Sequence, residues 1–398
     1  MMKRMMMAAL AFGLAAGAAQ AQEVKIGLQL PYSGVGAELA QPIERGVELY
    51  LKTHAEELKP YKITLIKRDV KDASGATAKI VVQELLTQDN VDVIAGWAYS
   101  PNAIATAPLI SAGKKLAVIM NAGTAHITNM SPYYVRTSFS MWHAGYAMGE
   151  AAAKNLKAKT AVIGYTDFPP GKDSLAAFKL GFESNGGKVI DEIPMGGANT
   201  VPDFTPFFQR AKDKKPDVFF VFIPGGDHST AVVRTYAALG MKDAGIKLVG
   251  PGDITQDTKL QPMGANADGL ITMHHYNADL DTPENKKFVA AWKKEYGANS
   301  TPDFMAVAGY DGMAAIAHVI KELKGKVDGD KAVALLKGWK YASPRGPIQI
   351  DPETRDIIMN EYLSQASYEN GRVVQKNIGK IEAVKDVCKA NKIGPCGK

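Results

Sequence analysis

The chain has 398 residues, of which 46% are hydrophobic and 22% are charged, and its formal net charge is +6. This composition is typical of a folded globular protein and excludes disorder of the whole chain, while the length predicts two domains. The basic residues are spread along the chain without a basic stripe of interleaved aromatics, which argues against nucleic-acid binding.

Residues 1–21 have the pattern of an export signal. Lys3 and Arg4 supply positive charge, residues 5–17 form an apolar stretch, and small residues at 19–21 provide a cleavage site. The apolar stretch is shorter than the ~20 residues that span a bilayer, so a cleaved signal is favoured over a membrane anchor. No cysteine stands at the cleavage point to carry a lipid. We therefore expect a soluble periplasmic protein without stable membrane insertion.

After the signal, short apolar runs alternate with longer stretches whose apolar residues recur at helical spacing. This alternation is typical of βαβ units and parallel sheets. The runs expected as strands are 24–30, 63–68, 91–94, 116–120, 160–164, 218–223 and 247–249. The stretches expected as helices include 42–55, 75–88, 103–110, 144–155, 172–185 and 204–212. Two successive series, divided near residue 140, predict an α/β protein with two doubly wound lobes, in which ligands bind beyond the carboxyl ends of the strands.

Two loops of the first lobe are candidates for binding an anion. Ser100 is expected to be the N-cap of a helix and Pro101 its first residue, which would present free N–H groups and the positive end of the helix dipole. Capping alone would also explain Ser100. The small residues at 121–125 follow the adjacent strand and allow close approach of the backbone. Together the loops predict a carboxylate site at Ser100, Ala122 and Thr124.

In the second lobe, loops rich in glycine and proline follow three predicted strands, at 164–171, 224–229 and 250–253. Turn formation alone would explain these residues. Because the loops lie at strand ends that face the other lobe, some of their residues are pocket candidates.

Cys388 and Cys396 are the only two cysteines and stand close to the C-terminus. In an oxidising compartment such a pair is expected to form a local disulfide. A zinc site is disfavoured because two thiolates supply only half of a tetrahedral ligand set.

Short motifs in a consistent order run over nearly all of the chain that follows the export signal. They are 24–27 with 32–34, Gly46, the turn at 69–78, the Ser100 loop, 123–124, 136–137, 250–251 and 309–311. With these motifs the sequence resembles the branched-chain amino acid binding proteins of bacterial ABC transporters, which have the type I periplasmic binding fold. The resemblance implies two lobes, joined by a hinge of three crossovers, that close on a ligand and dock on a transporter permease. It places one lobe at 24–140 plus 276–350 and the other at 141–275 plus 351–398.

The sequence departs from that family where the ligand's ammonium group is received. The family has a glutamate after the Gly-Pro of the second lobe and an aspartate soon after the Arg-Thr, whereas this chain has Gly252 and Met141. A buried carboxylate without a cation is costly, so the loss of both fits a ligand that has no ammonium group. Asp253 directly follows Gly252 in the chain. It could serve as a substitute carboxylate or, equally well, as an ordinary turn residue.

Aromatic residues gather in the predicted cleft loops, and the family includes relatives that bind acids of the benzoate and cinnamate type. Flat rings pack well against aromatic side chains. We therefore favour an aromatic acid, such as a benzoate, phenylacetate or cinnamate derivative, over a branched-chain or other hydrophobic amino acid. The pocket candidates are Trp97, Tyr99, Met141, His143, Tyr165, Phe168, Pro170, Gly225, Asp253 and His275. Of these, His143 and His275 lie at or near the implied crossovers and could hydrogen-bond a phenolic hydroxyl.

Two other functions stay open. A secreted enzyme is disfavoured because the sequence has no nucleophile elbow, zinc-binding His pair or phosphate loop. A receptor subunit that reports its ligand to a membrane sensor would show the same sequence features as a transport protein. We expect a monomer with no catalytic residue, metal or cofactor.

Overall fold

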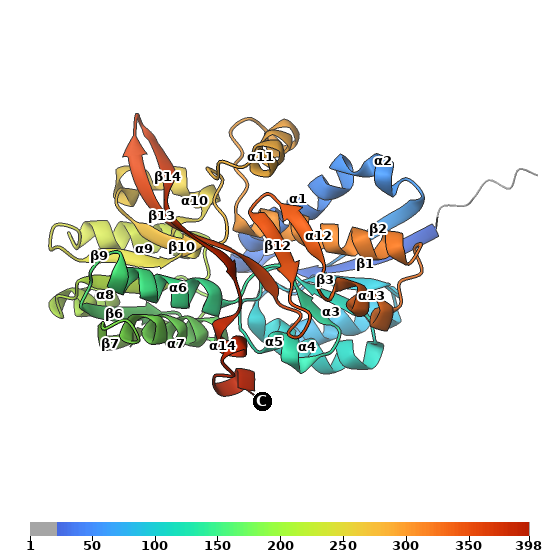
Figure 1. Ribbon diagram of the computed structural model, residues 1–398, viewed down its shortest axis with the longest axis horizontal. Coiled ribbons are helices and arrows are strands. Elements are labelled where there is room, and N and C mark those ends of the chain that lie inside the picture. The colour runs from blue at the N-terminus through green and yellow to red at the C-terminus, as the bar shows by residue number, and fades with distance from the viewer. Residues whose placement is uncertain (1–21, 398) are drawn as a thin grey trace, which may run out of the picture.

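The computed structural model describes residues 22–397, so the expected export signal at 1–21 lies outside the described residues. Two α/β lobes lie side by side (Figure 1). The α/β fold class with two doubly wound lobes is confirmed. Within the described part of the chain, no helix has the length and apolar character needed to cross a membrane.

The first lobe is built on a five-stranded parallel sheet in the order β2-β1-β3-β4-β5. Its strands are β1 (Gln22–Leu30), β2 (Tyr61–Asp69), β3 (Val93–Gly96), β4 (Leu116–Ile119) and β5 (Tyr134–Arg136). In the register, Ile26 pairs with Leu65 of β2 and with Val93 of β3. The apolar residues of β1, β3 and β4 are buried, as expected for central strands covered by helices.

Helices from two distant parts of the chain cover this sheet. They are α1 (Ala37–Thr53), α2 (Ala55–Leu58), α3 (Gly75–Thr87), α4 (Ser100–Gly113), α5 (Ile127–Met130), α11 (Pro283–Tyr296), α12 (Phe304–Glu322) and α13 (Gly329–Leu336). A Cβ added at Gly46 of α1 would lie 2.0 Å from the carbonyl oxygen of Ala306, and one at Gly309 of α12 would lie 2.1 Å from that of Ile43. The two glycines therefore let α1 and α12 pack backbone to backbone.

A nine-stranded mixed sheet in the order β11-β12-β13-β10-β9-β8-β6-β7, with β14 paired to β13, forms the core of the second lobe, and its β11–β12 end lies on the side of the first lobe (Figure 1). Its strands are β6 (Thr160–Tyr165), β7 (Lys188–Pro194), β8 (Val218–Phe222), β9 (Lys247–Pro251), β10 (Ile271–His274), β11 (Lys340–Ser343), β12 (Gly346–Ile350), β13 (Ile357–Glu369) and β14 (Arg372–Val384). Its helices are α6 (Met141–Lys154), α7 (Pro169–Glu183), α8 (Thr205–Asp213), α9 (Asp227–Ala238), α10 (Asp257–Met263) and α14 (Val387–Ala390). Strands β6 to β10 are parallel, and β11 to β14 are antiparallel additions at one side.

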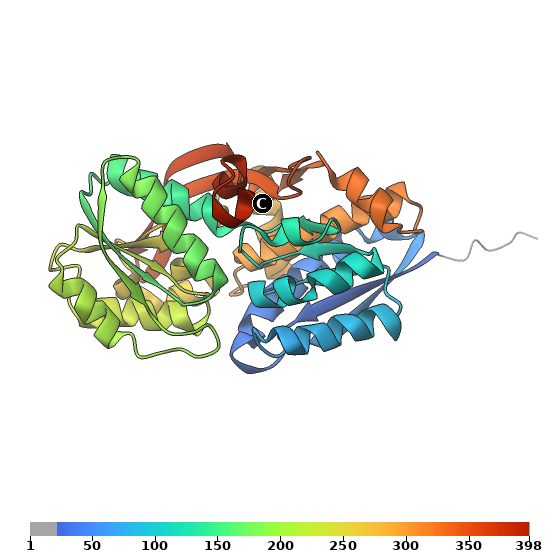
Figure 2. The ribbon, with the colours of Figure 1, turned by 90° about the horizontal axis from the view of Figure 1, so that it is seen from below.

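The C-terminal tail lies over the junction of the two lobes (Figure 2). The predicted disulfide between Cys388 and Cys396 is present in this tail.

The chain passes between the lobes at 137–140, at 275–282 and where β12 leads into β13. Arg345 lies where these passages meet, and its side chain is fully buried. Its guanidinium group is 2.7 Å from a carboxylate oxygen of Asp311, donates to the carbonyl oxygen of Ser138 at 2.9 Å, and lies 3.0 Å from Nδ1 of His275. One buried cation therefore contacts the first two passages, although the lobe boundaries expected from the sequence stay a prediction.

Removal of the Asp311 carboxylate should destabilise the protein strongly. The Asp311→Ala variant leaves the charge of Arg345 buried and unpaired, which costs about 3–5 kcal/mol of unfolding free energy. Urea denaturation of both proteins measures the difference. Glu382→Ala is the matched control, because Glu382 pairs with Lys380 on the surface, where ion pairs contribute little. A loss for Asp311→Ala no larger than that for the control would contradict the role assigned to Arg345.

Candidate ligand-binding site

A cavity lies between the lobes, where the carboxyl ends of the strands of both sheets meet. It is lined from the first lobe by Leu39, Ala98, Tyr99, Ser100, Asn121 and Gly123, from the first passage and the start of α6 by Phe139 and Met141, and from the second lobe by Phe168, Pro170, Phe222, Pro224 and Asp253. Its free volume is about 30 Å³, far below the ~300 Å³ at the lower end for small-molecule pockets. The structure is therefore a closed form in which the lining side chains nearly fill the site.

Polar contacts across the mouth of the cavity hold the lobes together. In the first lobe, Glu38 accepts a hydrogen bond from the backbone N–H of Asp227 at 2.6 Å and pairs with Lys259. Gln256 of the second lobe donates to a carboxylate oxygen of Asp303 at 2.7 Å. These contacts join α1 and α12 to α9 and α10, so opening the lobes requires breaking them.

The two loops of the predicted carboxylate site are brought together. The prediction that Ser100 is the N-cap is wrong, because α4 begins one residue earlier, with Tyr99 in the N-cap position. The Ser100 hydroxyl instead accepts a hydrogen bond from the backbone N–H of Thr124 at 3.1 Å. Oγ1 of Thr124 is buried without a hydrogen-bond partner in residues 22–397. Ala122 is buried and does not line the cavity, and its N–H donates to the carbonyl oxygen of Trp97 at 2.8 Å.

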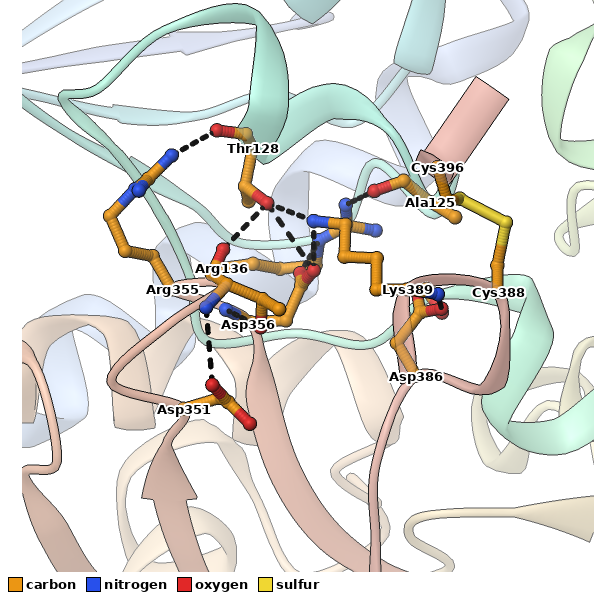
Figure 3. Close-up of polar contacts among 12 residues, drawn as sticks. Ala125, Thr128, Arg136, Asp351, Arg355, Asp356, Asp386, Cys388, Lys389 and Cys396 are labelled. Atoms are coloured by element: carbon orange, nitrogen blue, oxygen red, sulfur yellow. Dashed lines mark hydrogen bonds and ion pairs between the residues drawn. A yellow bond between two sulfur atoms is a disulfide. The ribbon is translucent and has the colours of Figure 1, made fainter. Parts of the chain in front are cut away.

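Arg136 fixes the shape of the second loop from below (Figure 3). Its guanidinium group donates to the carbonyl oxygens of Thr124 at 2.8 Å and Ala125 at 3.0 Å. It also forms an ion pair with Asp356 at 2.7 Å, and Lys389 of the C-terminal tail pairs with the same carboxylate. Burial alone would raise the pKa of Asp356, but the charges of Arg136 and Lys389 outweigh burial and hold that pKa below its usual value. Asp356 is thus a buried anion between two cations.

On the opposite wall, Asp253 presents a carboxyl group to the cavity. Asp253 is 4% exposed, its Oδ2 atom has no hydrogen-bond partner in the described chain, and burial raises its pKa to about 7. The Ser229 hydroxyl donates to the Asp253 carbonyl oxygen at 2.6 Å and so fixes the backbone.

Gly252 precedes Asp253, and the space that a larger side chain at position 252 would need is already occupied. A Cβ at this position would lie 2.4 Å from the ring of His274. The His274 ring is itself packed against Phe139 and Phe304, with ring centroids 5.2 Å and 4.5 Å apart. The space beside residue 252 is therefore filled by a neutral aromatic cluster.

Of the pocket candidates from the sequence, Tyr99, Met141, Phe168, Pro170 and Asp253 line the cavity. Gly225 does not line it, although its neighbour Pro224 does, and Tyr165 is half-buried at the end of β6. Seven lining residues were not proposed from the sequence: Leu39, Ala98, Asn121, Gly123, Phe139, Phe222 and Pro224. Five of them stand in or beside loops expected at strand ends, so their position along the chain was the available signal, whereas Phe139 lies in the first passage and Leu39 in α1.

Trp97, His143 and His275 lie outside the lining. Trp97 is in the core of the first lobe, where its indole N–H donates to Thr106 at 3.0 Å. His143 forms a capping box with Ser140 at the start of α6, and its Nε2 lies 3.1 Å from the carbonyl oxygen of Ile357. His275 contacts Arg345 in the hinge. The two histidines thus serve the passages between the lobes.

The geometry defines a two-lobed binding protein whose ligand is enclosed between the lobes. A family model described as periplasmic binding protein matches residues 23–372. The chain belongs to this family and is a solute-binding protein.

Proteins of known name and structure are similar over nearly the whole chain. A Leu/Ile/Val-binding protein homolog 6 of Brucella melitensis biotype 1 is 38% identical over 384 residues, which cover 96% of this chain and 97% of the relative. The solute-binding protein of an ABC transporter from Rhodopseudomonas palustris BisB5, solved with 3,4-dihydroxybenzoic acid, is 42% identical, with a TM-score of 0.88 and coverage of 92% and 99%. A corresponding protein from Rhodopseudomonas palustris HaA2, solved with p-hydroxybenzoic acid, is 35% identical, with a TM-score of 0.88 and coverage of 93% and 100%.

Replacement of His274 should change the dependence of stability on pH. Burial, to which the charge of Arg345 adds, lowers the pKa of His274 to about 3, whereas an unfolded histidine titrates near pH ~6.5. As the pH falls through this window, the unfolded chain binds a proton that the folded protein does not, which destabilises the fold by about 1.4 kcal/mol per pH unit. The His274→Leu variant lacks this penalty, so between about pH 6 and about pH 4 it should gain stability relative to the wild type at that rate. Denaturation at several pH values measures the two curves, and parallel curves would show that His274 contributes no such difference.

Proposed function

We propose that this protein is a periplasmic, monomeric solute-binding component of an ABC importer that binds an aromatic carboxylic acid between its lobes and presents it to the membrane permease. The observation that carries the proposal is the composition of the cavity. One end offers groups suited to a carboxylate, the walls are aromatic, and the positions of both ammonium partners in the amino acid binders hold Gly252 and Met141.

The carboxylate end is the junction of the Ser100 and Thr124 loops. Ser100 is the first residue of α4, where the helix dipole favours an anion. In this turn Pro101 has no N–H and those of Asn102 and Ala103 donate to the Tyr99 carbonyl oxygen, so within residues 22–397 the N–H of Ser100 is the one left for a ligand. Thr124 lies directly behind Gly123 of the lining, and its hydroxyl, which has no partner within residues 22–397, is a further donor for a carboxylate oxygen once the loop makes room for the ligand. Arg136 lies beneath this loop and adds positive charge without reaching the cavity surface.

The walls of the cavity suit a flat ring. Tyr99, Phe139, Phe168 and Phe222 contribute aromatic faces or edges, and the rings of Phe168 and Phe222 are stacked with centroids 6.0 Å apart. Met141 adds a polarisable sulfur, which packs favourably against aromatic rings. An aromatic acid would displace these side chains slightly and contact both lobes, so its binding would favour the closed form. The ligands of the two Rhodopseudomonas palustris relatives, both hydroxylated benzoic acids, support this choice.

A branched-chain amino acid is the second candidate ligand, favoured by the name of the Brucella melitensis relative, a Leu/Ile/Val-binding protein homolog. Its ammonium group would have to be received by Asp253, since no other lining residue in the described chain carries a charge. One carboxyl group with a pKa raised by burial is a weak substitute for the two acidic residues of the amino acid binders.

Thermal unfolding with a panel of ligands tests the proposal. We expect benzoate or hydroxybenzoates to raise the midpoint, because a ligand that binds only the folded state stabilises it by about 2.7 kcal/mol at one hundred times its Kd. The double variant Ser100→Ala and Thr124→Val should reduce this affinity by about tenfold or more, as expected for loss of hydrogen bonds to a charged group.

Ser111→Ala is the matched control, because Ser111 lies on the same helix and contacts Ser131 away from the cavity. Stabilisation by leucine with none by the aromatic acids would overturn the choice of ligand. Unchanged affinity in the double variant would overturn the carboxylate site.

A further inference from the structure

Asp253 is the one lining residue of the described cavity with an acidic side chain, and it lies on the wall opposite the carboxylate loops. Its Oδ2 atom is buried without a hydrogen-bond partner within residues 22–397. A buried acceptor without a donor costs free energy, and the cost is recovered only when a ligand supplies the donor. The orientation of this group therefore bears on which ligands fit.

The structure holds Asp253 in place from both sides. Its carbonyl oxygen accepts from Ser229, and the preceding Gly252 is packed against the ring of His274. These contacts fix the backbone that carries the carboxyl group on the second-lobe wall of the cavity. A site discriminates between ligands better when the backbone that carries its polar groups is held in place.

We propose that Asp253 accepts a hydrogen bond from a ring hydroxyl of the ligand and so selects hydroxylated aromatic acids over unsubstituted ones. This inference rests on the proposed function, in which the ligand carboxylate occupies the Ser100 and Thr124 loops. A ring anchored there points its far side at the second lobe, where Asp253 lies. A site built to bind a hydroxyl group rejects the analogue that lacks it, because the polar group of the protein is then left unpaired.

Asn121 is the competing acceptor in the lining. Its amide N–H donates to the carbonyl oxygen of Ala98 at 2.8 Å, and its Oδ1 atom has no partner in the described part of the chain. However, Asn121 lies in the loop after β4, beside the expected carboxylate, and its carbonyl oxygen would face the wrong end of the ring. The two acceptors are separated by comparing matched leucine variants, since leucine resembles both aspartate and asparagine in shape.

Calorimetric titration with benzoate, 3-hydroxybenzoate and 4-hydroxybenzoate tests the proposal on the full mature chain. The wild type should bind at least one hydroxybenzoate about tenfold to a hundredfold more tightly than benzoate. Asp253→Leu should reduce this preference to about threefold or less without lowering the affinity for benzoate. In this variant the ring hydroxyl of the ligand loses its acceptor, while the aromatic ring keeps its contacts with the cavity walls. Asp253→Asn keeps an acceptor oxygen and should retain most of the preference. Asn121→Leu should leave the preference intact.

The outcomes distinguish a failure of the proposed function from a failure of the role assigned to Asp253. If none of the three acids binds the wild type, the proposed function itself is wrong. If all three bind equally well, the function stands and the role of Asp253 is wrong. A preference that survives in Asp253→Leu, or that disappears in Asn121→Leu, would likewise overturn the assignment to Asp253. Circular dichroism detects a folding defect in Asp253→Leu. If there is one, the Asp253→Asn variant decides, and loss of the preference for hydroxybenzoates in Asp253→Asn would overturn the proposal.

Discussion

The buried ion pair between Arg136 and Asp356 is the contact on which the ligand site depends. Arg136 ends β5 of the first lobe, while Asp356 precedes β13 of the second, so the pair joins two passages of the hinge. The same guanidinium group binds the carbonyl oxygens of the loop at 122–125. The shape of the carboxylate loop is therefore set by the same cation that joins the lobes, and Lys389 extends this network to the disulfide-closed tail. A buried charge without its partner is strongly destabilising, which makes every member of the network dependent on the others.

A second buried cation, Arg345, acts in the same way on the other side of the hinge. It joins Asp311 of α12 to the carbonyl oxygens of the first passage and to His275 of the second. Charged groups are costly in a hinge unless their hydrogen bonds are satisfied, and both arginines are satisfied largely by backbone carbonyl oxygens. Such bonds restrain the path of the backbone in the passages between the lobes. The closed position of the lobes is held instead by contacts between them, such as the hydrogen bond from Gln256 to Asp303.

Hydrophobic patterning predicted the central strands well and the rest of the sheet poorly. Runs such as 218–223 are apolar throughout because both faces of the strand are covered, and they were recognised from that pattern. β5 has only three residues, and β14 is largely exposed with a polar sequence, so neither has a clear apolar period. The loops of the site were predictable because ligand loops follow buried parallel strands. His143 and His275 were misplaced because burial and partners such as Ser140 and Arg345 come from distant parts of the chain, which one sequence does not reveal.

The resemblance to the amino acid binders implies that Gly252 stands where those proteins have an ammonium partner, and the structure shows what occupies the space beside it. Removal of a side chain would leave a cavity, but here the ring of His274 fills the space, and burial keeps this ring neutral by lowering its pKa. Phe139 and Phe304 pack around the ring and continue the apolar surface towards the site. An ammonium group at this wall would lose its water and gain no full negative charge in return, because burial raises the pKa of neighbouring Asp253 to about 7. Desolvation of a hydroxyl group costs much less than desolvation of a charge, and a single acceptor compensates for it. In the function that we propose, this wall is therefore suited to an uncharged polar group.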